Sequence, residues 1–320
     1  MNKDIEIINN SDNKITLKQD FVFKKLFSEN ENLLKSLLEA ILNVKITKID
    51  VVKDFTLDNY LQSSRGGILD IKAEINGKTT INIEMQVRNE HNITDRLLFY
   101  SSSLRNMSVK KGKDFSDVKP VISIGILDYI NYPHKEATNF FSESKFVIFQ
   151  TNLEGKQIEL ETLNQKHRII IIELPKFNKI KHHLNDKLQQ WLTVIEWKNF
   201  KEIENVMKSN EEIKEAVKQL TTLIEDNEVR AVYEYELQTE ILRNTEDRIL
   251  KEKSIAEGKK QGIKQGKEEG IKEGLEKGME KGMEKGIKQT ILKFIQSGLS
   301  KKQISEILEI DLNKLEQLIK

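Results

Sequence analysis

The stretch from residue 68 to residue 86, ILDIKAEINGKTTINIEMQ, constrains the fold most strongly. Asn76-Gly77 is a strong turn signal between two apolar runs. A two-residue loop would set apolar residues opposite polar ones, whereas a three-residue loop over 76–78 aligns the apolar residues. Its pairs are Ile75–Thr79, Ala73–Ile81, Ile71–Ile83 and Leu69–Met85. A slip of one residue would move every side chain to the other face, so the sequence predicts this hairpin register.

The same register places two carboxylates opposite each other on the second face of the hairpin. Asp70 falls opposite Glu84, and Gln86 follows on the same face. Directly opposed residues have Cβ atoms about 5 Å apart, and two carboxylates there repel by roughly 1 to 3 kcal/mol. A divalent cation would reverse this repulsion, since Mg²⁺ takes carboxylates together with water and phosphate oxygens. A solvated polar face, with Lys72 offsetting the charge, is the alternative.

Helical and strand patterns alternate up to Pro175, which indicates an α/β domain with a mixed central sheet. Two helices are expected within residues 18–42, one on each side of a break. An amphipathic helix follows the hairpin over residues 92–109. Strands are expected at 46–57, 118–129, 144–152 and 167–175, the last three of them buried and the last ended by Pro175.

Beyond Pro175 the chain has helical periodicity to residue 256. Ser209 and Glu212 have the spacing of a capping box before an amphipathic run. The apolar and aromatic residues of the preceding segment are expected to pack in a core: Trp191, Leu192, Ile195 and Trp197.

Glycine then recurs every four residues, from Gly258 to Gly286, among Lys, Glu and apolar residues. Each glycine costs about 1 kcal/mol in a helix interior relative to alanine. Two interpretations remain: a flexible charged tether, or a helix that packs closely on a partner. We favour the self-associating helix. The high charge argues against a membrane dimer of the GxxxG type.

The last stretch, residues 289–320, predicts three short helices. Gly298 would end the first, and Ser300 and Asp311 would cap the second and third. This layout resembles a helix-turn-helix unit, and a small helical cap or a dimer contact is the alternative.

Composition limits the class of protein. The net charge is +1 and there is no cysteine, which excludes disulfides, Cys-ligated zinc and thiol catalysis and fits a reducing cytoplasm. The N-terminus lacks the pattern of a signal peptide, and the apolar run at 168–174 is too short to cross a membrane. We therefore expect a cytoplasmic protein without a membrane partner.

Several motifs in order carry a resemblance to a known family. They are QDFVFKKLF, LLEAIL, LDIKAE with INIEMQ, DRLLFYSSSL, KGKDF, KPVISIGIL and the glycine repeat preceded by AEG. The hairpin resembles the D…ExK signature of PD-(D/E)xK nucleases, and the chain is similar to the Rpn-like recombination-promoting nucleases and putative transposases. The resemblance spans about residues 14–130 and 250–290.

The resemblance implies a restriction-endonuclease-like core in which Asp70 and Glu84 bind Mg²⁺ or another divalent cation. Gln86 stands where the superfamily most often has lysine; a glutamine cannot act as a base, which leaves the strength of catalysis open. Asp20 and Lys24 match the opening pattern of the family and would support the site, with a surface ion pair as the alternative.

Arg96 and Tyr100 would contact DNA. Residues 88–119 carry seven basic and four acidic residues, a local excess of positive charge that suits phosphate groups, although a solvated helix face is the alternative.

The predicted organisation has four parts. They are a nuclease domain at 14–175, a helical region at 176–256, a glycine-repeat helix at 257–287 and a small helical unit at 288–320. We expect a Mg²⁺-dependent DNA endonuclease that promotes recombination, related to transposases and acting as a homodimer. The alternative is a DNA-binding or regulatory protein that keeps the nuclease fold with weak or lost catalysis.

Overall fold

The computed structural model describes residues 3–10, 15–52, 70–109, 112, 114–162 and 166–319. The chain divides into two compact units, Met1–Glu236 and Leu237–Lys320, which we describe separately.

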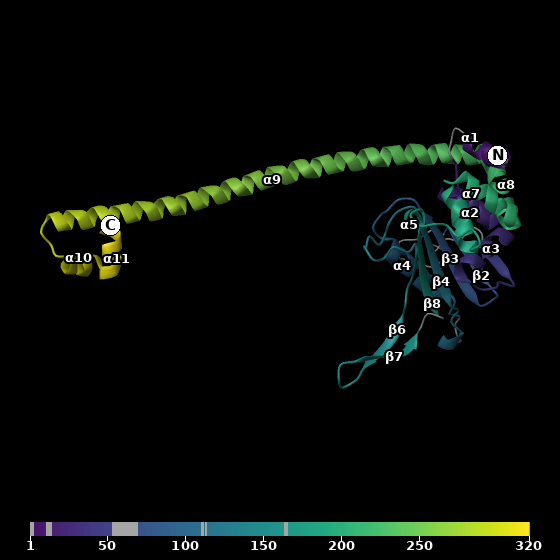
Figure 1. The fold of residues 1–320 in the computed structure, drawn as a ribbon, viewed down its shortest axis with the longest axis horizontal. Coiled ribbons are helices and arrows are strands. Elements are labelled where there is room, and N and C mark those ends of the chain that lie inside the picture. The colour runs from purple at the N-terminus through teal and green to yellow at the C-terminus, as the bar shows by residue number, and fades with distance from the viewer. Residues whose placement is uncertain are drawn as a thin grey trace. The chain divides into compact units, whose positions relative to one another are not determined.

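The first unit is built on a six-stranded mixed sheet with the order β1-β2-β3-β4-β8-β5 (Figure 1). Strands β3, β4 and β8 run parallel to one another, while β1, β2 and β5 join by antiparallel pairing. The strands are β1 (Ile49–Val52), β2 (Ile71–Ile75), β3 (Thr79–Gln86), β4 (Val121–Leu127), β5 (Phe141–Glu143) and β8 (His167–Glu173). This is the α/β mixed sheet that the sequence predicts, consistent with a restriction-endonuclease-like fold.

The β2–β3 hairpin has the predicted register. Ile71 pairs with Ile83, Ala73 with Ile81 and Ile75 with Thr79, which leaves a three-residue loop. Asn76 and Gly77 both adopt positive φ, the conformation that the Asn-Gly dipeptide tolerates. The expected Leu69–Met85 pair lies outside the described residues because residue 69 is among those not described.

Helices cover both faces of this sheet. The larger core joins the sheet to α2 (Asp20–Glu29), α3 (Glu31–Leu42), α6 (Lys187–Glu196) and α8 (Glu211–Glu225), and it buries Trp191, Leu192 and Ile195 as expected. Helix α4 (Ile93–Met107) packs on the other face through Ile93 and Leu97. The described part of this unit also contains α1 (Lys3–Asn10), α5 (Leu174–Phe177), α7 (Phe200–Ser209) and the first residues of α9 (Asn227–Gln296).

Gly125 of β4 lets α4 approach the sheet closely. A Cβ atom at this position would lie 3.0 Å from Leu97 Cδ1, which is closer than ordinary van der Waals contact. Gly125 also pairs with Glu84 in the sheet register, so this close approach occurs beside one of the predicted carboxylates.

Two local predictions are wrong. The strand expected at 144–152 forms as β6 (Val147–Thr151), but it pairs with β7 (Gln157–Thr162) in a separate exposed hairpin and is not buried. The cap of α8 is Asn210, whose side chain accepts a hydrogen bond from Ile213 N, because the helix begins one residue later than the Ser209 capping box requires.

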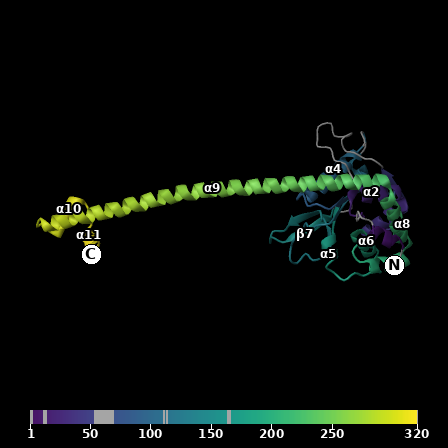
Figure 2. The same ribbon diagram turned by 90° about the horizontal axis from the view of Figure 1, so that it is seen from above.

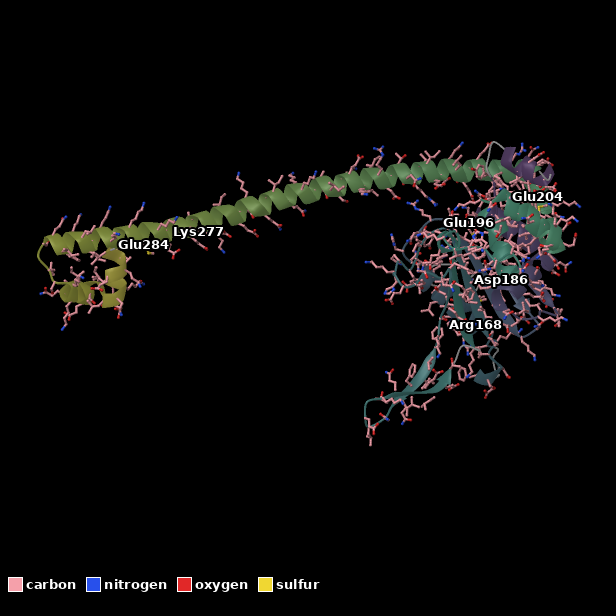
Figure 3. All side chains as sticks on the ribbon, in the orientation of Figure 1. Arg168, Asp186, Glu196, Glu204, Lys277 and Glu284 are labelled. Atoms are coloured by element: carbon pink, nitrogen blue, oxygen red, sulfur yellow. The ribbon has the colours of Figure 1, made fainter. Side chains whose placement is uncertain are left out.

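Helix α9 (Asn227–Gln296) is continuous over 70 residues and includes the glycine repeat (Figure 2). Its glycines, from Gly258 to Gly286, face open space, so no close contact within the described chain requires them. Side chains such as Lys277 and Glu284 point outward from the helix (Figure 3).

The second unit ends in a small helical core. Ile291 of α9, Ile304 of α10 (Lys301–Leu308) and Leu315 of α11 (Leu312–Ile319) are buried together. Ser300 caps α10 in a full capping box, and Asp311 accepts a hydrogen bond from Asn313 N at the start of α11. The first of the three helices is not short, because it is the end of α9.

Candidate active site

Asp70 lies immediately before β2 and is tied to the next strand by a backbone hydrogen bond. Its Oδ2 atom accepts from Met85 N at 2.8 Å, and the residue is 6% exposed. The paired part of the hairpin ends at Ile71–Ile83, and Asp70, one residue earlier, is close enough to Glu84 for their charges to interact. Burial raises the pKa of Asp70 well above its usual value, and the negative charges of Glu84 and Asp20 raise it further.

Glu84 is fully buried in the middle of the sheet, beneath α4. Burial raises its pKa to about 7, partly opposed by the positive charge of Arg96 and by Asn82. Its Oε2 atom lies 3.1 Å from Arg96 Nε, but neither carboxylate oxygen has a partner in hydrogen-bond geometry among the described residues. Such a buried, incompletely satisfied carboxylate is costly unless another group completes its coordination.

Asp20, at the start of α2, forms the solvent side of the same acidic cluster. Its side chain is hydrogen-bonded to that of Asp70, and Lys24 and Arg96 act on its charge. Partial desolvation raises the pKa of Asp20 although its outer side is exposed. The structure thus brings Asp20, Asp70 and Glu84 together, with Lys24 close enough to act on the charge of Asp20.

Arg96 connects the two other predicted residues of the site. Its Nη1 atom donates to Gln86 Oε1 at 3.5 Å, and its guanidinium carbon lies 5.6 Å from the centre of the Tyr100 ring. Tyr100 is mostly buried, and that burial raises the pKa of its hydroxyl. In this structure Tyr100 supports Arg96, and a contact of either residue with DNA stays a prediction.

Three polar neighbours were not predicted. Asn82 lies two residues before Glu84 on the same strand face, and its fully buried amide favours the ionised form of Glu84. Ser123, its neighbour on β4, is also buried, and its hydroxyl has no hydrogen-bond partner among the described residues. The asparagine in the otherwise apolar run TINIE was the available signal for these buried polar residues.

Glu236 of α9 is the third neighbour that was not predicted. Its carboxyl interacts with the charge of Asp20, and no local sequence pattern indicates this contact.

Only a few side chains of the cluster could bind a divalent cation directly. Among the residues that the structure describes, no group of three or more His, Cys, Asp or Glu residues has metal-ligand geometry. Two carboxylates completed by water and phosphate oxygens are nevertheless a common environment for Mg²⁺. Burial raises the pKa values of both Asp70 and Glu84, and a nearby positive charge would favour their ionised forms.

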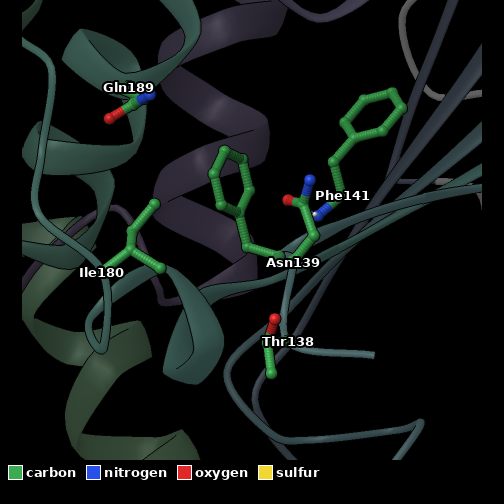
Figure 4. A pocket seen from close by; sticks show the side chains of 6 residues that line it. Thr138, Asn139, Phe141, Ile180 and Gln189 are labelled. Atoms are coloured by element: carbon green, nitrogen blue, oxygen red, sulfur yellow. Dashed lines mark hydrogen bonds between the residues drawn. The ribbon is translucent and has the colours of Figure 1, made fainter. Parts of the chain in front are cut away.

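A separate pocket of about 550 Å³ lies elsewhere in the first unit (Figure 4). It is lined by Thr138, Asn139, Phe140, Phe141, Ile180 and Gln189. None of these six residues belongs to the acidic cluster, so the pocket adds nothing to the site.

A mixed sheet with Asp70 just before β2 and Glu84 on β3 is consistent with the class of restriction-endonuclease-like folds. A comparison with models of known families finds a match over residues 17–246 to the PD-(D/E)XK nuclease family transposases. Because this match covers more than half of the 320 residues, the chain belongs to that family. The comparisons with curated proteins and with solved structures found no match.

The family match confirms the resemblance drawn from the sequence, and with it a nuclease-related function with DNA as the implied substrate. Its extent differs from the expected one, since it runs through the helical region and ends before the glycine repeat. In the described part of the chain, no helix is both long and apolar enough to cross a membrane.

Proposed function

We propose that this protein is a Mg²⁺-dependent DNA endonuclease, related to transposases, that promotes recombination in the cytoplasm. One observation carries the proposal: Asp20 of α2, Asp70 just before β2 and Glu84 of β3 meet in one cluster where the pKa of each carboxyl is raised. A fold has no need of such an arrangement, because burying adjacent carboxylates disfavours their charged forms.

Asp70 and Glu84 would hold the cation, and Asp20 would complete the site from the solvent side. A bound Mg²⁺ supplies a lowered pKa for water and stabilisation of the charge that develops on the phosphate. The hydrogen bond from Met85 N ties the Asp70 carboxylate to β3, the strand that carries Glu84. This hydrogen bond preserves the spacing on which a shared cation depends.

Gln86 and Arg96 would act on the substrate. The Gln86 amide can orient water or donate an N–H to a phosphate oxygen, but it cannot accept a proton as a base. The Arg96 guanidinium is partly exposed beside Glu84, and it would donate hydrogen bonds to a phosphate oxygen of the substrate.

Nicking of supercoiled plasmid in Mg²⁺ tests this proposal. The wild type is expected to nick, and Asp70→Asn and Glu84→Gln to lose nicking while keeping the fold. Glu212→Gln, on an exposed face of α8, is the matched control and should nick normally. Equal nicking by all four proteins would refute the assignment of the site.

A second candidate is a DNA-binding or regulatory protein with weak or lost hydrolysis. Gln86 favours it, since the usual lysine is missing, and so does Arg96, which already compensates the charge of Glu84. Retained DNA binding with no nicking by the wild type, at any pH or with Mn²⁺ in place of Mg²⁺, would favour this function over the first.

A further inference from the structure

The β6–β7 hairpin extends away from the main sheet of the first unit (Figures 1 and 3). All of β7 and four of the five residues of β6 are exposed. The hairpin nevertheless carries five large apolar side chains that are at least 45% exposed: Ile148, Phe149, Leu153, Ile158 and Leu160. A lone two-stranded hairpin is marginally stable in water, so this density of exposed apolar groups points to a partner.

The outer edge of β6 has none of the charges that usually protect an edge strand. The eight residues from Phe146 to Leu153, FVIFQTNL, include no charged residue and no proline. Within the described chain, β6 pairs only with β7, so its other edge presents free backbone donors and acceptors. An exposed, uncharged edge of this kind is a template for pairing with another strand.

The charge of the hairpin argues against DNA as its partner. Residues 145–162 contain two lysines and three glutamates, which gives the hairpin a small negative charge unsuited to DNA phosphates. A second copy of the chain could use either edge of the hairpin. Symmetric antiparallel pairing of β7 centred on Leu160 would set Glu159 opposite Glu161 twice, and like charges directly opposite destabilise a sheet.

Symmetric pairing of β6 has no such conflict. About Phe149 as the centre, Phe149 meets its own copy, Ile148 meets Gln150 and Val147 meets Thr151. We propose that β6 is a self-association edge, at which two copies of this chain pair antiparallel and join their hairpins into one four-stranded sheet. The contact is isologous, so the pairing closes at two copies. This proposal does not depend on nuclease activity.

The absence of cysteine from the sequence permits a direct test on the full chain. Single cysteines are placed in turn at residues 147–151, five positions because a register irregularity lies between Ile148 and Phe149. Phe115→Cys, another highly exposed apolar position, is the matched control. Under mild oxidation at low protein concentration, Phe149→Cys is expected to form disulfide dimers at least about 100-fold faster than the control, because pairing raises the effective thiol concentration.

The pairing register gives a second readout. A mixture of Val147→Cys and Thr151→Cys should cross-link faster than either variant alone, since these positions face each other only in the antiparallel pair. Cross-linking of all five variants at the rate of Phe115→Cys, with thermal unfolding as in wild type, overturns the proposal. A loss of DNA affinity in Phe149→Lys without cross-linking in the cysteine variants would also overturn it and assign the hairpin to DNA.

Discussion

Arg96 of α4 lies across the sheet surface from Glu84, with 3.1 Å between its Nε atom and the Glu84 Oε2 atom. This ion pair is the main counterweight to the burial that raises the pKa of Glu84 to about 7. Arg96 therefore acts directly on the charge state of Glu84 near neutral pH, and the first two predictions follow from this interaction.

Glu84→Gln is expected to stabilise the cation-free protein at pH 8. The folded-state pKa of Glu84 is raised above its ordinary value of 4.5, so the folded state binds more protons than the unfolded chain between pH 4.5 and about 7. The stability of the wild type therefore falls as the pH rises through that window, by up to about 3 kcal/mol for this group. Chemical unfolding at pH 5 and pH 8 measures it; a variant no more stable than wild type at pH 8 would contradict the prediction.

Arg96→Gln should shift the acid limb of nicking to higher pH. Loss of the guanidinium charge removes the interaction that favours ionised Glu84 and so raises its pKa further. We expect nicking at pH 7 to fall roughly tenfold and to recover in part at pH 9. The measurement is the pH profile of kcat/KM for plasmid nicking, with Arg105→Gln as the control on the same helix; unchanged profiles for both variants would exclude the role.

Mg²⁺ should raise the unfolding temperature of the wild type and not of Asp70→Asn. A cation that binds only the folded state stabilises it by about 2.7 kcal/mol at a hundredfold excess over its Kd. Thermal unfolding in EDTA and in Mg²⁺ gives the comparison, with Glu212→Gln expected to respond like wild type. An equal response of Asp70→Asn would place the cation elsewhere.

Asn82→Leu is expected to keep the stability of the protein and lower its activity. The amide is fully buried, so an apolar group of similar size removes the cost of desolvating it. The same change removes the support that Asn82 gives to ionised Glu84, and nicking at pH 7 should fall about tenfold. Unfolding and nicking are measured on the same preparation; a loss of both together would indicate a purely structural residue.

Glycine-to-alanine substitutions should change the free energy of unfolding in opposite directions in the two units. Gly125→Ala places a methyl group 3.0 Å from Leu97 Cδ1, which should cost about 1 to 3 kcal/mol of stability. Gly270→Ala in α9 meets no neighbouring atom and should gain about 1 kcal/mol of helix stability. Unfolding monitored separately for each unit distinguishes them. A neutral Gly125→Ala would show that α4 can move away from the sheet.

The sequence predicted the parts of the fold that depend on local pattern. Alternation and the Asn76-Gly77 turn were sufficient for the β2–β3 register, because a slip would have exposed Ile71, Ala73 and Ile83. Phe149 shows the limit of this reasoning. An apolar run predicts a strand equally well whether a core or a partner molecule covers it, so β6 was wrongly expected to be buried.

The acidic cluster was likewise only partly predictable from the sequence. Asp70 and Glu84 share a hairpin, so their proximity followed from counting residues. The hydrogen bond between Asp20 and Asp70 and the interaction of Glu236 with Asp20 join segments that are distant in the chain. Such contacts depend on how helices pack on the sheet, which no local pattern specifies. Asn82 is an intermediate case: the alternation of polar and apolar residues shows that it faces the same side of β3 as Glu84, but nothing in the sequence indicates its role.

The three-residue loop between β2 and β3 also bears on how the protein folds. Joining two strands through so short a connection costs little chain entropy, whereas the parallel pairing of β3 with β4 must wait for the whole α4 crossover. Asp70 and Glu84 can therefore meet early in folding, before the layer that encloses them exists. The two carboxylates then repel each other while still in water, where the repulsion is weakest. They become buried only when α4 packs on the sheet and brings Arg96 next to Glu84.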